Sequence, residues 1–292
     1  MKWVKRVLGL IILLGVGTVV AFNLHEGKAF DSQPAMMIDK ELDTSGCLGM
    51  NYHRVRNASL LEQSIAWVTK SDELTKYSVS TQEFDSQMKY LQEQNVTFVT
   101  PQQIKEYQKK GDFPEKCVWV SFDDIDQSVY NNAYPILKEQ NIPFTIYLIV
   151  GRIGQGNYKH MTMANWDEVR TMHQSGLAVL GSHTYDMHEL QNDGKTPVFA
   201  TKNSYQSFSE DLDQSVRTIE DRTGTKPETF AIPYGNTSDA LNEKIRQSGF
   251  ETNGILAPRT IGPEDYPYYM NRIIINQSLF DQHVKPWLQN QV

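Results

Sequence analysis

Two pairs of chemically active side chains stand out in this chain of 292 residues. Asp123 and Asp124 end a strongly apolar run, and His183 and His188 lie where a later apolar run ends. One carboxylate and two imidazoles can bind a single divalent metal and leave coordination positions for water and substrate. The second carboxylate would then be free to act as a base on that water. The pattern therefore indicates a metal-dependent hydrolase.

These residues also have ordinary structural interpretations. Asp123 and Asp124 could form a turn, or the N-cap of a helix that begins near Gln127. His183 and His188 are too far apart in the sequence to share one turn of a helix face, where neighbours are three or four residues apart. An irregular segment between them would have to point both rings at one metal.

The elements that must position these residues alternate along the chain. Short apolar runs typical of strands are separated by amphipathic stretches typical of helices. Such alternation predicts parallel strands with right-handed crossovers. Because many strands look buried on both faces, we expect an α/β fold, a distorted (β/α) barrel of about seven or eight strands. The expected strands are 48–53, 96–99, 117–122, 144–150, 177–182, 229–232, 252–256 and 273–275, and the expected helices include 130–139, 166–174, 208–222 and 239–247.

In such a barrel the catalytic groups gather at the carboxyl ends of the strands. Asp123 and Asp124 end one expected strand, and His183 ends another. Strand direction alone would therefore bring them toward one rim.

The start of the chain has the pattern of an export signal. Lys2, Lys5 and Arg6 precede the apolar run 7–22, as a positive n-region precedes a hydrophobic h-region. The segment is interpreted as a signal peptide, cleaved after Ala21, or as an uncleaved signal anchor. Either predicts an exported protein that is secreted or attached to the cell surface. We divide the chain into a signal peptide or signal anchor (1–22), a linker (23–46) and one catalytic domain (47–292).

Net charge and cysteine content limit the binding partners and the disulfides that the protein can have. The net charge of −7 disfavours a broad phosphate-binding surface, so no nucleic-acid partner is expected. Cys47 and Cys117 do not make a disulfide framework. Cys117 lies in an apolar run, where a free cysteine behaves as a small buried hydrophobe. We expect two free thiols, the alternative being a single bridge between them.

Several motifs resemble those of the polysaccharide deacetylases of carbohydrate esterase family 4. Ser121-Phe122-Asp123-Asp124 and His183-Thr184-x-x-x-His188 resemble the first two motifs of that family. Asn51-Tyr52-His53-Arg54-Val55 resembles the circularly permuted branch, in which a histidine that ordinary members carry late lies near the start. The runs 118–124, 132–138 and 232–235 are similar to that branch as well, and the resemblance spans about residues 48–290.

The resemblance implies a role for each site residue. Asp124, His183 and His188 would bind one divalent metal, zinc or else nickel, cobalt or iron. Asp123 would be the general base and His53 the general acid that protonates the leaving amine.

Two further residues would support the catalytic groups. The backbone N–H of Tyr234 would help to bind the tetrahedral oxyanion. Arg272, beside the last expected strand, could form an ion pair with Asp123 and orient it, or could be an ordinary surface charge.

The permuted branch acts on extracellular poly-β-1,6-N-acetyl-D-glucosamine, the adhesin of biofilms. The resemblance therefore implies an N-deacetylase that releases acetate from this polymer during biofilm matrix maturation. We expect a monomer that can associate with the membrane or the cell surface. One alternative is the same chemistry on β-1,4 glycans of the peptidoglycan or chitin type. An alternative of another class is a surface glycan-binding module without catalysis.

Overall fold

The computed structural model describes residues 42–57, 76–235 and 237–290. The predicted signal segment 1–22 lies outside the described residues, as does the linker up to residue 41. None of the helices in the described ranges combines the length and the apolar character that a membrane crossing requires.

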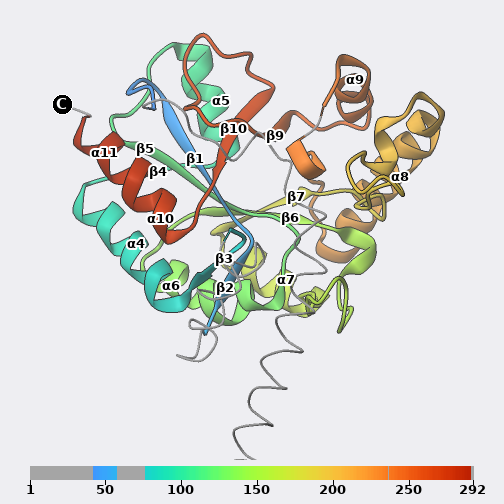
Figure 1. Cartoon of the computed structure of the whole chain (residues 1–292), viewed down its shortest axis with the longest axis horizontal. Coiled ribbons are helices and arrows are strands. Elements are labelled where there is room, and N and C mark those ends of the chain that lie inside the picture. Colours follow the sequence, from blue (N-terminus) through green and yellow to red (C-terminus); the bar gives the residue numbers. More distant parts are fainter. Residues whose placement is uncertain (1–41, 58–75, 236, 291–292) are drawn as a thin grey trace, which may run out of the picture.

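Seven parallel strands form a closed barrel (Figure 1). Their order around the ring is β1, β10, β9, β8, β7, β6 and β5, and the ring closes because β5 pairs with β1 over the full length of both strands. An eighth strand, β4, pairs with the start of β5. The predicted (β/α) barrel is thus confirmed. The strands are β1 (Cys47–Tyr52), β4 (Thr97–Phe98), β5 (Cys117–Phe122), β6 (Phe144–Leu148), β7 (Ala178–Ser182), β8 (Thr229–Ala231), β9 (Thr252–Leu256) and β10 (Tyr269–Ile274), and the short strands β2 (Arg54–Arg56) and β3 (Ser78–Ser80) pair beside the barrel.

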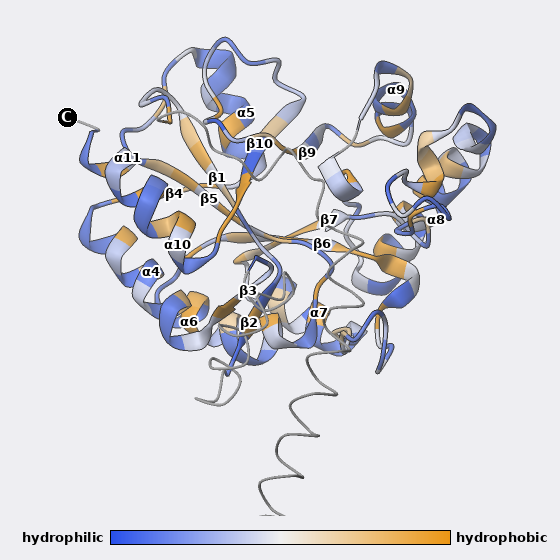
Figure 2. Cartoon of the chain, in the orientation of Figure 1, coloured by the Kyte–Doolittle hydropathy of each residue, from blue (hydrophilic) through white to orange (hydrophobic). Residues whose placement is uncertain are grey.

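Helices surround the barrel and turn their hydrophilic residues outward (Figure 2). A capping box begins α4: Ser80 accepts from the N–H of Glu83, whose carboxylate accepts from the N–H of Ser80. The helical segments are α4 (Thr81–Glu93), α5 (Pro101–Lys110), η2 (Val129–Ala133), α6 (Tyr134–Glu139), η3 (Val150–Arg152), α7 (Trp166–Gln174), η4 (Val198–Ala200), η5 (Lys202–Ser204), α8 (Tyr205–Thr223), η6 (Pro233–Gly235), α9 (Asp239–Gln247), α10 (Gln277–Leu279), η7 (Phe280–Val284) and α11 (Lys285–Gln289).

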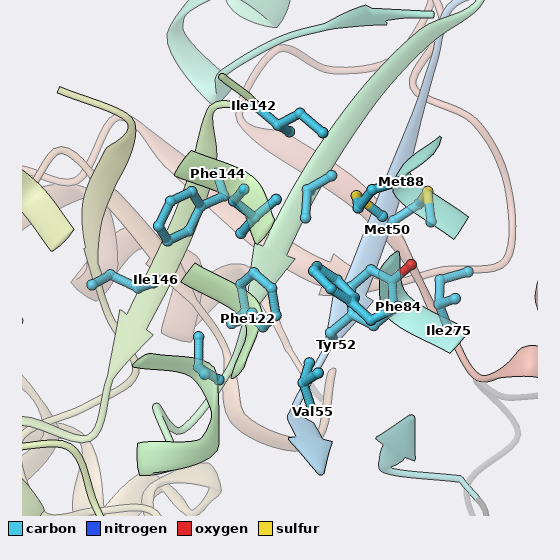
Figure 3. Packing of buried hydrophobic residues seen from close by; sticks show 14 of the residues in the cluster. Met50, Tyr52, Val55, Phe84, Met88, Phe122, Ile142, Phe144, Ile146 and Ile275 are labelled. Carbon is cyan, nitrogen blue, oxygen red and sulfur yellow. The ribbon is translucent and has the colours of Figure 1, made fainter. Parts of the chain in front are cut away.

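The main hydrophobic core lies between the barrel and its helices (Figure 3). Phe84 of α4 packs edge-on against Tyr52 of β1, with ring centroids 5.1 Å apart, and lies 5.8 Å from Phe122 of β5. The Tyr52 hydroxyl donates to Gln87, also of α4, at 2.7 Å. This packing fixes the two strands that lead directly into the candidate site.

The inside of the barrel contains a buried arginine between aromatic rings. The guanidinium of Arg272 lies 5.0 Å from the ring centre of Tyr147 and 5.9 Å from that of Trp119. Glycines on neighbouring strands make room, because a Cβ at Gly254 would lie 2.9 Å from Nε of Arg272 and one at Gly181 would lie 2.5 Å from the ring of Tyr147. The interior is therefore shaped around one cationic side chain.

The expectation of two free thiols is wrong, because Cys47 and Cys117 form a disulfide. They are the first residues of β1 and β5, which pair in register, and their Cα atoms are 4.4 Å apart. The prediction that Cys117 is buried is confirmed, and Cys47 is fully buried as well. What the sequence did not reveal is that β1 and β5, 70 residues apart, are neighbours that close the ring.

Candidate metal and catalytic site

The candidate site lies where the strands end. His53 follows β1, Asp123 and Asp124 follow β5, and His183 follows β7. Because all of these strands are parallel, their carboxyl ends meet at the same end of the barrel. The structure thus brings together residues that the sequence separates widely.

Asp124, His183 and His188 form a buried cluster in which one ligand atom from each lies within 4.8 Å of the others. Oδ1 of Asp124 is 3.6 Å from Nε2 of His183 and 3.4 Å from Nε2 of His188. That oxygen has no hydrogen-bond partner within the described part of the chain. Metal–ligand bonds to such atoms are about 2.0–2.2 Å long, so an ion placed between the three atoms would satisfy all of them. The residues therefore fit a divalent metal.

The two imidazoles are positioned in different ways. Nδ1 of His183 lies 2.6 Å from the carbonyl oxygen of Ala231 at the end of β8, so it donates there, and Nε2 is the ring nitrogen that faces the cluster. Burial lowers the pKa of His188 to about 3, although the carboxylate of Asp124 acts in the opposite direction. His188 is therefore neutral at pH 7, which is the form that binds metals.

Asp123 is oriented by three charge-assisted hydrogen bonds. Arg272 donates from Nη1 to Oδ1 at 2.5 Å and from Nη2 to Oδ2 at 3.0 Å, and Asn51 donates to Oδ2 at 3.0 Å. Of the two roles considered for Arg272, the ion pair is present, and the arginine is fully buried. Burial alone would raise the pKa of Asp123, but the charge and hydrogen bonds of Arg272, together with the nearby His183 and His53, outweigh burial and hold that pKa well below its usual range. Asp123 is thus a fixed, ionised carboxylate.

His53 lies beside the same two carboxylates. Burial lowers its pKa, while the charges of Asp124 and Asp123 act in the opposite direction. Its ring packs edge-on against Tyr77, with centroids 4.9 Å apart. The structure therefore places His53 within the electrostatic reach of the aspartates, as the sequence led us to expect.

Four residues at the candidate site have strained backbone conformations. Asp124, Ile125, Thr184 and Tyr234 all have positive φ angles, of 67°, 65°, 79° and 62°. Such conformations are unfavourable for residues other than glycine and cluster at functional sites. Each follows a strand end, so the chain turns sharply at the points where it presents the site residues.

Tyr234 lies against the second histidine. Its ring centre is 5.1 Å from that of His188, and its hydroxyl donates to the His188 carbonyl oxygen at 3.3 Å. The role predicted for the Tyr234 backbone N–H at an oxyanion stays a prediction.

Sequence reasoning assigned no role to two residues that support the site. Asn51 was part of a recognised motif, but its bond to Asp123 depends on the side-by-side pairing of β1 with β5. Asp211 accepts hydrogen bonds from the N–H groups of Tyr185 and Asp186, between the two histidines. A signal for Asp211 existed, since it is a charged residue on the apolar face of a helix, between Phe208 and Leu212.

Known proteins are similar to this chain over most of its length. Residues 110–253 match the polysaccharide deacetylase family. The poly-β-1,6-N-acetyl-D-glucosamine N-deacetylase of Staphylococcus aureus is 34% identical over 286 residues, which cover 98% of this chain and 96% of that protein. The protein of the same name from Staphylococcus epidermidis is 31% identical over 245 residues, 84% of either chain.

A solved structure is similar as well. The structure of IcaB from Ammonifex degensii matches with a TM-score of 0.75 and 32% sequence identity, covering 86% of this chain and 100% of that one.

Proposed function

Because this chain belongs to the polysaccharide deacetylase family and is a hydrolase of linear amide bonds, we propose that its substrate is poly-β-1,6-N-acetyl-D-glucosamine. In this proposal the enzyme uses one divalent metal, removes N-acetyl groups and releases acetate. The observation that carries it is the buried cluster of Asp124, His183 and His188 beside an aspartate fixed by Arg272. The names of the staphylococcal relatives support the choice of polymer.

Asp124, His183 and His188 would bind the metal, which we propose to be zinc, although nickel, cobalt and iron accept the same donors. Such an ion polarises a carbonyl group and lowers the pKa of bound water to roughly 7. The neutral imidazole of His188 and the ionised carboxylate of Asp124 need no further change in protonation to act as ligands.

The proton transfers are assigned to Asp123 and His53. Asp123 takes the proton of the attacking water, and the donors from Arg272 and Asn51 keep its carboxylate aimed while this happens. His53 delivers a proton to the nitrogen that leaves as an amine. The backbone N–H of Tyr234 would stabilise the oxyanion between these two steps.

The product would be a polymer with free amino groups, which are cationic at neutral pH and can bind anionic cell surfaces. We propose that the enzyme acts outside the cell as a monomer during biofilm matrix maturation, secreted or attached to the cell surface. The support is the export pattern of residues 1–22 and the polymer named for the relatives.

An acetate-release assay on β-1,6 and β-1,4 oligomers of N-acetylglucosamine tests the proposal. We expect release from the β-1,6 series, loss after chelation, and recovery when zinc, nickel, cobalt or ferrous iron is added back. Release from β-1,4 oligomers alone would assign the enzyme to peptidoglycan- or chitin-type glycans. Binding of oligomers without acetate release, in protein that contains metal, would favour a non-catalytic glycan-binding module.

A further inference from the structure

The segment from His183 to His188 has to direct two rings at one point, and the second ring packs against Tyr234 without a hydrogen bond of the kind that fixes the first. The ring of His183 is fixed through its Nδ1 by the carbonyl oxygen of Ala231. Nδ1 of His188 has no hydrogen-bond partner among the residues that the structure describes. The direction of the His188 ring therefore depends strongly on the backbone that carries it.

A single carboxylate binds the middle of that backbone. Oδ1 of Asp211 accepts from the N–H of Tyr185 at 2.7 Å, and Oδ2 accepts from the N–H of Asp186 at 2.8 Å. Asp211 is only 8% exposed. Hydrogen bonds from N–H groups to an ionised carboxylate are roughly twice as strong as neutral ones. Asp211 thus binds both amides at the centre of the segment.

The same face of α8 also contacts the chain just before His183. The hydroxyls of Ser215 and Ser182 are hydrogen-bonded to each other, and Ser215 lies one helical turn after Asp211. α8 itself is fixed by Phe208 and Leu212, which are fully buried. One helix therefore contacts the chain on both sides of His183, through the Ser182 side chain before it and through two backbone N–H groups after it.

Other contacts complete the segment but bind different groups. The N–H groups of Val150 and Gly151 donate to the carbonyl oxygens of Thr184 and Tyr185, at 3.0 Å and 2.7 Å. Lys159 donates to the carbonyl oxygen of His188 at 2.9 Å. These contacts occupy carbonyl groups, whereas Asp211 binds the amides of two consecutive residues.

We propose that Asp211 is a positioning residue that sets the metal affinity of the site by fixing the backbone between His183 and His188. The inference rests on the proposed metal-dependent function. It adds a part of the metal-binding apparatus that lies on α8, outside the strand ends that carry the ligands. Outer-shell groups of this kind typically change metal affinity by about 10–100-fold.

Asp211→Asn tests the proposal, because it keeps the shape of the side chain and replaces one acceptor oxygen by a donor that would face a backbone N–H. We expect the affinity for cobalt(II), measured by competition with a chelator, to fall by about 10–100-fold. At saturating cobalt the visible absorption bands should differ from those of the wild type. In the acetate assay, excess metal should recover the lost kcat while the KM for the glycan stays unchanged.

The matched control is Asp213→Asn on the same helix. Asp213 is exposed and accepts from Ser248 at 2.8 Å, away from the site. Its substitution should leave cobalt affinity and spectrum as in the wild type. Thermal unfolding in chelator identifies any variant that is not folded at the assay temperature. Asp211→Glu provides a second variant, since it retains the charge but moves the carboxylate by one methylene, and it too should bind cobalt more weakly than the control.

The outcomes separate the two ideas. If the wild type binds no divalent metal, the proposed function fails. A second result would refute the role of Asp211 and leave the proposed function standing. In that result the wild type binds cobalt, and both folded Asp211 variants have cobalt affinities within about twofold of the Asp213 control, which is less than outer-shell groups usually cause.

Discussion

At the scale of single residues, two adjacent aspartates have opposite surroundings. Asp123 accepts hydrogen bonds from Arg272 and Asn51, whereas Oδ1 of Asp124 faces the imidazoles of His183 and His188. The turn between them is sharp, because Asp124 has a φ of 67°. This difference in contacts is the physical basis for giving them different roles.

Substitution of each aspartate by asparagine should therefore have different effects. Asp123→Asn should lower kcat by about 10²–10⁴-fold, the usual size of a general-base contribution, and leave metal content unchanged. Asp124→Asn should lose the metal on dialysis, because it removes a charged ligand. Metal analysis of the purified variants, together with acetate release, checks both. Equal metal loss in the two variants would contradict the division of roles.

Arg272 illustrates the cost of a buried charge. Its guanidinium lies between Tyr147 and Trp119 and has Asp123 as its anionic partner. Removing one partner of a buried ion pair leaves the other charge uncompensated, which costs more than removing both.

Arg272→Met should therefore lower the free energy of unfolding by about 3–5 kcal/mol. The double variant Asp123→Asn/Arg272→Met should be more stable than Arg272→Met alone, because no unpaired carboxylate remains. Urea unfolding of the two single variants and the double variant at pH 7 gives the coupling energy. Strictly additive effects would show that the pair is not coupled.

At the scale of elements, the sequence predicted best the elements whose ends carry their own signals. Strand 117–122 and helices 166–174 and 239–247 match the structure residue for residue. α7 begins after Asn165, whose side chain accepts from two backbone N–H groups of its first turn. Local capping chemistry decides such boundaries, and it is visible in the sequence.

The elements that tertiary contacts decide were harder to predict. β10 begins at Tyr269, not at 273 as expected, because the polar residues Asn271 and Arg272 are buried within the strand and interrupt the apolar pattern. The positions of Asp123, Asp124 and His183 followed from strand direction, but His53 required the family resemblance. The disulfide and the contacts of Asp211 depend on which elements lie side by side, which local patterns do not encode.

The disulfide between β1 and β5 should contribute to the stability of the barrel. It closes a segment of 70 residues, for which loop-closure entropy predicts a contribution of about 4 kcal/mol. The double variant Cys47→Ala/Cys117→Ala should unfold at lower urea concentration, while acetate release from folded protein stays near that of the wild type, because the bridge lies at the opposite ends of the strands from the site. Denaturant curves with and without reductant provide the measurement. Unchanged stability would show that strand pairing alone closes the ring.

At the scale of the whole molecule, the first and last barrel strands are neighbours. β1 lies between β10 and β5, although β10 comes near the end of the chain. The ends of the domain are also joined, since Nε1 of Trp287 in α11 donates to the carbonyl oxygen of Asp43 at 2.9 Å. Strands that are distant in the sequence thus form one continuous part of the wall.

The site residues come from two arcs of the barrel wall. The arc that contains β5 and β7 presents Asp123, Asp124, His183 and His188, and it falls within the part that matches the polysaccharide deacetylase family. The arc of β10 and β1 supplies Arg272, Asn51 and His53 and falls outside that part. A chain in which β1 followed β10 would place the same side chains at the same position in the barrel wall, between β10 and β5. The order of these residues along the chain therefore depends on where the ring is opened, and the strand that precedes His53 would occupy the same place in the wall if it came last in the chain.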